Sequence, residues 1–199
     1  MAMTTLPIAP LTLRAALFPR ANSLTNSLLV LSGAAFLAVM AQIALPVPGS
    51  PVPVTGQTLG VLLIGASYGP ALSISTVALY LAVGAAGAPI FSNGGSGFAK
   101  LVGPTGGYLA GMVLTALVLG YLANKKWDAR FRTALPAMLI GEVLTFIPGL
   151  IWLQHATGKD WSWTFSAGFT PFILGEAIKI SLAAVTLPTI WKVVDKRRS

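Results

Sequence analysis

Long apolar runs, interrupted by Gly and Pro instead of charged residues, are the main pattern of this chain. No Asp, Glu, Lys or Arg lies between Arg20 and Lys100, and no water-soluble core needs an uncharged run of that length. Helical periods, caps and stops predict long membrane-spanning helices over about 26–45, 103–123, 135–155 and 171–191.

The region between the first two long helices has a different pattern. Alternating prolines over 46–56 forbid a helix and favour extended backbone. A helix over about 57–68 follows, but its length of about 18 Å at 1.5 Å per residue falls short of the roughly 30 Å hydrocarbon core. Gly69 and Pro70 are expected to turn the chain into a further helix that ends near residue 86. Polar loops are predicted over 91–97, 124–132 and 156–168.

Composition and charge support a membrane protein. Of the 199 residues, 55% are hydrophobic and 9% are charged, with a net charge of +8 and a mean hydropathy of +0.79. The basic residues are therefore interpreted as flanking membrane spans, not as binding nucleic acid. The basic residues gather in three regions: the N-terminal tail with Arg14 and Arg20, the loop over 124–132 and the C-terminal tail over 192–199. Six crossings place all three regions on the cytoplasmic side. We expect a cytoplasmic tail over 1–25, a six-helix domain over 26–191 and a basic cytoplasmic tail over 192–199.

Three ionisable residues lie inside predicted spans. Glu176 and Lys179 are three residues apart, on one face of the last helix. Each would cost about 2.5–3.5 kcal/mol facing lipid at the bilayer centre, so both are expected to face protein. They form either a structural ion pair or, as the pattern favours, a ligand contact. Glu142 has no basic partner nearby in sequence; it is either a proton site or, as a single acid favours, a neutral packing group.

Two further segments are candidates for function. Non-helical backbone at membrane depth is tolerated when it is buried in protein or lines a polar cavity, so residues 46–58 are predicted to be an outward-facing binding loop. Small residues at helical spacing in the first span allow another helix to approach closely, either within the bundle or from a partner protein. These residues are Ala34, Ala38 and Ala41.

Motifs for chemistry are missing from the chain. Gly103-Pro-Thr-Gly-Gly107 lacks the Gly-Lys-Ser/Thr of a nucleotide-binding loop, and there is no His-Glu-x-x-His or Gly-x-Ser-x-Gly sequence. The chain has no cysteine, which excludes disulfides and thiolate metal sites. We therefore expect no enzyme activity, no cofactor and no bound metal. Spans composed mostly of Leu, Val, Ala and Ile also disfavour a channel.

Three stretches of the chain carry a family resemblance: Pro46-Val-Pro-Gly-Ser-Pro-Val-Pro-Val-Thr-Gly-Gln-Thr-Leu-Gly-Val-Leu-Leu63, Gly103-Pro-Thr-Gly-Gly-Tyr-Leu-Ala-Gly111 and Pro171-Phe-Ile-Leu-Gly-Glu-Ala-Ile-Lys179. Together they resemble the BioY family, the biotin-binding S-components of energy-coupling factor (ECF) transporters. The resemblance implies an all-α integral membrane protein, a six-transmembrane-helix bundle with a short second helix and a Pro-rich lid loop. It also implies a prokaryotic inner membrane with both termini cytoplasmic.

The resemblance implies partners as well. Biotin would be captured from outside, and transport would require a membrane scaffold (T) subunit and two ATPase (A) subunits, engaged through the small residues of the first helix. An S-component for a different vitamin, a solitary secondary transporter and an intramembrane enzyme remain the alternatives.

Residue roles follow from the same resemblance. The implied biotin-binding residues are Glu176, Lys179, Asn93, Tyr108, Gln57, Phe91 and Trp152. The implied lid residues are Pro48, Ser50, Pro51, Pro53 and Thr55, and the implied partner contacts are Ala34, Ala38 and Ala41. Glu176 and Asn93 would pair with the ureido ring of biotin, and the aromatic residues would form the walls. The family usually has Pro-Gly-Asp where this chain has Leu174-Gly175-Glu176, so the acid is one methylene longer.

Overall fold

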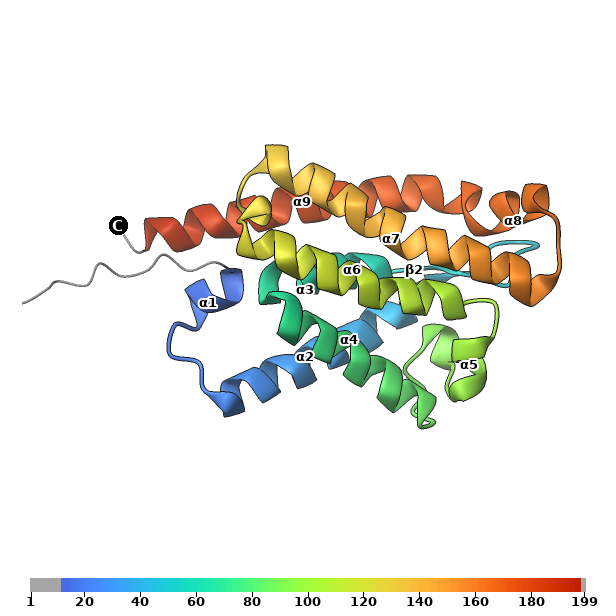
Figure 1. The fold of residues 1–199 in the computed structure, drawn as a ribbon, viewed down its shortest axis with the longest axis horizontal. Helices are drawn as coiled ribbons and strands as arrows, with labels where there is room; N and C mark the ends of the chain where they lie inside the picture. The colour runs from blue at the N-terminus through green and yellow to red at the C-terminus, as the bar shows by residue number, and fades with distance from the viewer. Residues whose placement is uncertain (1–11, 198–199) are drawn as a thin grey trace, which may run out of the picture.

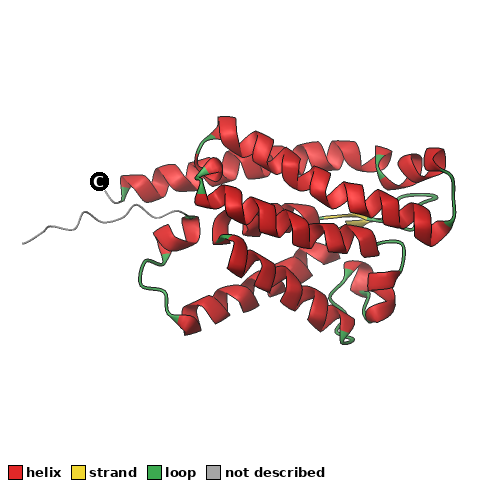
Figure 2. Cartoon of the chain, in the orientation of Figure 1, coloured by secondary structure: helices red, strands yellow, loops and turns green. Residues whose placement is uncertain are grey.

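The computed structural model describes residues 12–197, and most of this part of the chain is helical (Figures 1 and 2). The α-helices are α1 (Leu13–Leu17), α2 (Ser23–Gln42), α3 (Gln57–Tyr68), α4 (Pro70–Ala85), α5 (Phe98–Val102), α6 (Gly106–Asn124), α7 (Phe131–Thr157), α8 (Trp161–Gly168) and α9 (Ile173–Lys196). Short 3-10 turns form η1 (Ser92–Gly94), η2 (Trp127–Ala129) and η3 (Thr170–Phe172). The short strands β1 (Ala44–Leu45) and β2 (Val54–Thr55) form a hairpin.

The predicted pattern of apolar helices is confirmed within the described residues. Four segments are long and apolar enough to cross a membrane: α2, α6, α7 and the α8–α9 segment. The helices α3 and α4 are apolar but have 12 and 16 residues, so the count of six crossings stays a prediction. The break between them falls where the sequence predicted it, because Gly69 has a φ of +84° and Pro70 begins the next helix.

The two ends of the bundle differ in what they carry. Figure 1 shows α1, the α6–α7 connection and the C-terminal end of α9 at one end, and the hairpin, α5 and α8 at the other. The basic regions that the charge pattern assigned to one side of the membrane therefore share one end of the molecule. Which side of the membrane this end faces stays a prediction.

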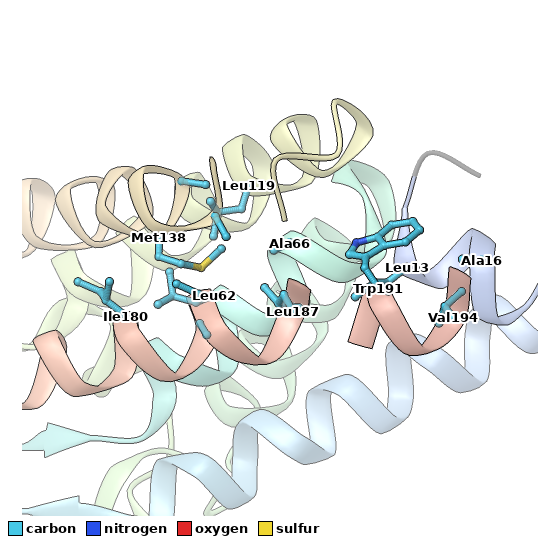
Figure 3. Close-up of a cluster of buried hydrophobic side chains, with 14 residues drawn as sticks. Leu13, Ala16, Leu62, Ala66, Leu119, Met138, Ile180, Leu187, Trp191 and Val194 are labelled. Atoms are coloured by element: carbon cyan, nitrogen blue, oxygen red, sulfur yellow. The ribbon is translucent and has the colours of Figure 1, made fainter. Parts of the chain in front are cut away.

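A hydrophobic cluster near the basic end joins five helices. Leu13 and Ala16 of α1 are buried in the same cluster as Leu62 of α3 and as Trp191 and Val194 of α9 (Figure 3). The described part of the predicted N-terminal tail therefore contains a packed helix, α1, and the expected domain bounds stay a prediction. The helix α9 also continues through Lys196 into the predicted C-terminal tail. Residues 1–11 and 198–199 lie outside the described part.

The expected loop over 156–168 is wrong for most of its length, because α8 occupies Trp161–Gly168. The side chain of Asp160 accepts a hydrogen bond of 2.8 Å from the backbone N–H of Trp163, which is an N-cap. The short helix α5 likewise follows the Gly-rich loop at a place where no element was expected.

The small residues of α2 are used within the chain. Ala34 and Ala41 are buried in a second core cluster with Val77 and Tyr80 of α4, and Ala38 packs against the same cluster. Of the two alternatives for these alanines, packing within the bundle is present, because α3 and α4 pack against α2; their contact with a partner protein stays a prediction. The opposite face of α2 exposes large apolar side chains, namely Leu24, Leu28, Leu31 and Val39.

Candidate ligand-binding site

A small cavity lies beneath the β1–β2 hairpin. The hairpin is at the end of the bundle opposite the basic regions (Figure 1). Its walls come from the hairpin, α3, the η1–α5 segment, α6, α7 and the start of α9. The lining residues are Val52, Pro53, Thr55, Gln57, Thr58, Phe91, Ser92, Lys100, Thr105, Tyr108, Leu109, Met112, Phe146, Phe172 and Glu176. The volume is about 40 Å³, enough for one or a few water molecules. The protein's own side chains thus nearly fill this space.

The hairpin closes the cavity from outside. Its strands are antiparallel with two residue pairs, Ala44 with Thr55 and Leu45 with Val54, and the prolines between them prevent a longer ladder. Ser50 stabilises the turn, since its hydroxyl accepts a 3.0 Å hydrogen bond from the N–H of Val52. The Val52 side chain is buried in a cluster with aromatic residues of α6, α7 and η3, so the hairpin is held against the bundle by apolar contact.

A buried polar cluster lies where the hairpin meets α9. Lys179 Nζ is 2.7 Å from Glu176 Oε1, and it also donates to Thr58 Oγ1 at 2.9 Å and to the Thr55 carbonyl oxygen at 2.6 Å. The Thr58 hydroxyl in turn donates to Glu176 Oε2 at 2.8 Å. All three ammonium hydrogens of Lys179 therefore have acceptors. Glu176 is in the first turn of α9, where the helix dipole favours a negative charge.

A second acid lies beside this cluster. Glu142 of α7 is 6% exposed, and neither of its carboxyl oxygens has a hydrogen-bond partner. It interacts electrostatically with Glu176 and Lys179. Glu142 does not line the cavity, but it lines a groove between α7 and α9 together with Glu176 and otherwise mostly apolar residues.

Aromatic side chains form the apolar walls. Tyr108 is stacked on Phe172 and meets Phe146 edge to face, while its hydroxyl donates a 2.8 Å hydrogen bond to the Gly168 carbonyl. On the other side, Phe91 packs edge-on against Tyr80 with ring centroids 5.5 Å apart. Such contacts fix the rings of Tyr108 and Phe91 in place at the wall of the cavity.

The sequence model of the BioY family matches residues 12–196. The chain belongs to the BioY family. It is 39% identical over 163 residues to the biotin transporter BioY2 of Lactococcus lactis, covering 79% of this chain and 85% of the relative. It is 37% identical to the biotin transporter BioY of Thermotoga maritima, covering 82% and 94% of the two chains.

The fold matches a solved structure as well. The crystal structure of the S-component for biotin from an ECF-type ABC transporter superposes with a TM-score of 0.76, at 25% sequence identity, over 86% of this chain and 95% of that chain. The predicted fold class, an S-component-like helical membrane protein, is confirmed.

The three stretches that carried the BioY resemblance meet at the cavity. The first contributes the hairpin and the start of α3, the second contributes Thr105 and Tyr108, and the third contributes Glu176. Residues far apart in the sequence thus line one space, as expected for a binding site in a member of the BioY family.

Most of the residues expected to bind the ligand are at the cavity. Glu176, Tyr108, Gln57 and Phe91 line it, and Lys179 is joined to it through Glu176 and Thr58. The Gln57 amide is engaged within the protein, since it donates to the Tyr80 hydroxyl at 2.8 Å and accepts from the Thr55 hydroxyl at 3.0 Å. Of the expected lid residues, Pro53 and Thr55 line the cavity, Ser50 stabilises the turn, and Pro48 and Pro51 are exposed.

Two residues expected to contact the ligand, Asn93 and Trp152, do not line the cavity, and their contact with a ligand stays a prediction. Asn93 is exposed in η1, with a φ of 57°, and does not line the cavity. Its place in a turn that needs a left-handed residue explains an Asn there without a ligand. Trp152 is half-buried and donates a 2.9 Å hydrogen bond to the Gly103 carbonyl, so it holds the turn before α6 instead of forming a cavity wall.

Lys100 is the main residue that the sequence analysis missed. The sequence pattern marked it only as the end of the uncharged run, and it lines the cavity. The helix α5, which carries it, packs against α4 and α6, whereas α9 packs against α3 and α7, so Lys100 and Glu176 reach the cavity from different elements. Lys100 is the sole charged residue between Arg20 and Lys125, and this isolation was the available signal.

Proposed function

We propose that this protein is the biotin-binding S-component of an ECF-type transporter and captures biotin from the extracytoplasmic side of a prokaryotic inner membrane. The observation that carries the proposal is the Glu176–Lys179–Thr58 cluster at a cavity closed by the hairpin, in a chain of the BioY family. In this role the protein binds and releases biotin unchanged and catalyses no reaction of its own.

The chemistry of biotin matches the two kinds of polar group at the cavity. The ureido ring has two N–H donors and a carbonyl acceptor, and the Glu176 carboxylate accepts from the N–H groups. The carboxylate at the end of the valeryl chain pairs with the Lys100 ammonium. The fused rings and the chain pack between Phe91 and Tyr108.

Entry of biotin requires the hairpin to move. A cavity of about 40 Å³ cannot hold a bicyclic ligand, so the closed hairpin and the side chains beneath it must open outward. Lys179 links this movement to the site, because it contacts the hairpin backbone at Thr55 and the acid at Glu176 together. The hairpin is therefore assigned as the lid.

Transport requires energy from partner proteins. We propose that the chain works with a membrane scaffold subunit and two ATPase subunits. Their binding side is the cytoplasmic end, which carries α1, η2 and the end of α9. The exposed apolar face of α2, with Leu24, Leu28 and Leu31, is the surface proposed for the scaffold subunit in place of the buried alanines.

The test is ligand binding by the purified protein. Isothermal titration in detergent is expected to give saturable binding of biotin and none of thiamine or riboflavin, two other vitamins. Binding of one of those vitamins without biotin would assign the chain to a different substrate. Uptake of radiolabelled biotin by proteoliposomes, with and without scaffold and ATPase subunits, then tests the need for partners; full ATP-independent uptake by the chain alone would favour a solitary transporter.

A further inference from the structure

Glu142 is a buried acid that the proposed binding site does not use. It lies about three helical turns from the start of α7, inside a segment that is long and apolar enough to span the membrane. Its side chain is 6% exposed and both carboxyl oxygens lack hydrogen-bond partners. Buried polar groups in folded proteins almost always have a partner, so this acid requires an explanation.

The charges around Glu142 come from one helix. Glu176 and Lys179 of α9 are the groups that interact with it. The helices α3 and α6 also pack against α7 but contain no Asp, Glu, Lys, Arg or His. The elements η2 and α8 contact α7 as well, and their acids, Asp128 and Asp160, flank the two ends of that helix.

The cluster has two carboxyls and one ammonium. The hydrogens of Lys179 are already given to Thr55, Thr58 and Glu176, so Lys179 has no donor left for Glu142. If both acids were ionised, the cluster would keep an unbalanced negative charge among mostly apolar side chains of α7 and α9. Such a charge is costly at this depth, and two neighbouring carboxyls avoid it by holding one proton between them.

We propose that Glu142 and Glu176 share one proton and that Glu142, as the protonated acid, is a positioning residue that holds the ionised Glu176 towards the ligand cavity. The proton gives Glu142 a donor, and the Glu176 carboxylate is the nearby acceptor. Lys179 then balances the single remaining charge. This inference rests on the proposed function, because Glu142 acts through Glu176 and does not line the cavity.

The proposal predicts a specific pattern among variants. Glu142→Gln keeps the size of the side chain, a neutral charge and a donor, so its affinity for biotin at neutral pH should stay within about threefold of the wild type. Glu142→Leu removes the donor and should weaken binding by about tenfold. A packing role alone would instead make the apolar variant the better tolerated of the two.

The pH profile separates positioning from packing. Raising the pH removes the shared proton and adds a second negative charge beside Glu176, so wild-type affinity should fall. Glu142→Gln has no such proton and should bind more tightly than the wild type on the alkaline side. Identical profiles for the two proteins would overturn the proposal.

Infrared spectroscopy tests the proton without any ligand. The purified wild type should show a protonated-carboxyl C=O stretch at neutral pH, and Glu142→Gln should lack it. Asp160→Asn, which removes an exposed acid, is the matched control and should keep the band. If the wild type binds no biotin, the proposed function fails while the infrared result still decides the shared proton. The shared-proton proposal would be overturned if Glu142→Gln lost as much affinity as Glu142→Leu. It would also be overturned if Glu142→Gln kept the infrared band of the wild type.

Discussion

The ammonium group of Lys179 donates a 2.6 Å hydrogen bond to the backbone carbonyl of Thr55, so a side chain of α9 is tied to the β1–β2 hairpin. The same ammonium group forms the ion pair with Glu176. One residue therefore contacts both the hairpin and the buried acid at the cavity. Because the backbone carbonyl accepts this bond, any residue at position 55 would provide it, and the specificity of the link lies in Lys179.

Replacing Lys179 by Met should weaken biotin binding at least about tenfold, since the substitution removes the ion-pair partner of Glu176 and one hydrogen bond that holds the hairpin. The dissociation rate should account for most of this change. Stopped-flow tryptophan fluorescence measures the association and dissociation rates of biotin. Lys192→Met, an exposed position on the same helix, is the control and should behave as the wild type. An unchanged dissociation rate in Lys179→Met would show that the ammonium does not hold the lid.

Lys100→Met should reduce the affinity for biotin about tenfold or more, because it removes the cation assigned to the valeryl carboxylate. The methyl ester of biotin lacks that charge, so its affinity should be equal for the wild type and for Lys100→Met. Competition titrations with the two ligands measure this difference. A variant that still prefers biotin over the ester would place the carboxylate elsewhere.

The buried acid Asp128 should make the stability of the folded protein depend on pH. This acid of η2 is 1% exposed and accepts a hydrogen bond from Trp191 Nε1, and burial raises the pKa of Asp128 from 3.8 to about 6. Between these values the folded state holds the proton and the unfolded state has lost it, so stability should fall as the pH rises from about 4 to about 6. The full effect of a shift of this size is about 3 kcal/mol.

The variant Asp128→Asn keeps an acceptor for Trp191 but cannot ionise. It should lose this pH dependence and be more stable than the wild type at pH 7. Thermal melts in detergent across the acidic range measure both effects. If the two proteins keep parallel melting profiles, Asp128 is not the group responsible.

The bundle has no room for a methyl group at Gly107. A Cβ at this position of α6 would overlap the Pro148 carbonyl oxygen and the Trp152 side chain of α7. Gly107→Ala should therefore lower the stability by roughly 1–3 kcal/mol, seen as a lower melting temperature. Ala110→Val, on the exposed side of the same helix, should melt near the wild type. Equal melting of all three proteins would mean that α6 and α7 can separate without cost.

The sequence predicted the helices well because each depends on local signals. Apolar runs, Gly69-Pro70 and the proline-rich stretch mark the chain directly, and the corresponding helices and hairpin are present. The elements α1 and α8 were missed for a physical reason: both are short, and their helical state depends on packing or on a cap such as Asp160.

The sequence predicted the part of the site that lies on a single helix. It did not predict the part that several elements bring together. Glu176 and Lys179 are three residues apart, so their pairing followed from helix geometry. Lys100 reaches the cavity through the path of the chain from α4 to α6, which no local pattern specifies. The burial of Ala34 and Ala41 was equally open, because small residues suit contacts inside the chain and with a partner alike.

The decisive experiment is a calorimetric titration of biotin into the purified wild type and Glu176→Ala. The wild type should show saturable binding and the variant at least about tenfold weaker binding, with equal melting temperatures confirming that both are folded. Equal affinities would contradict the assignment of Glu176 as the ligand acid. A folded wild type that binds no biotin would contradict the function itself.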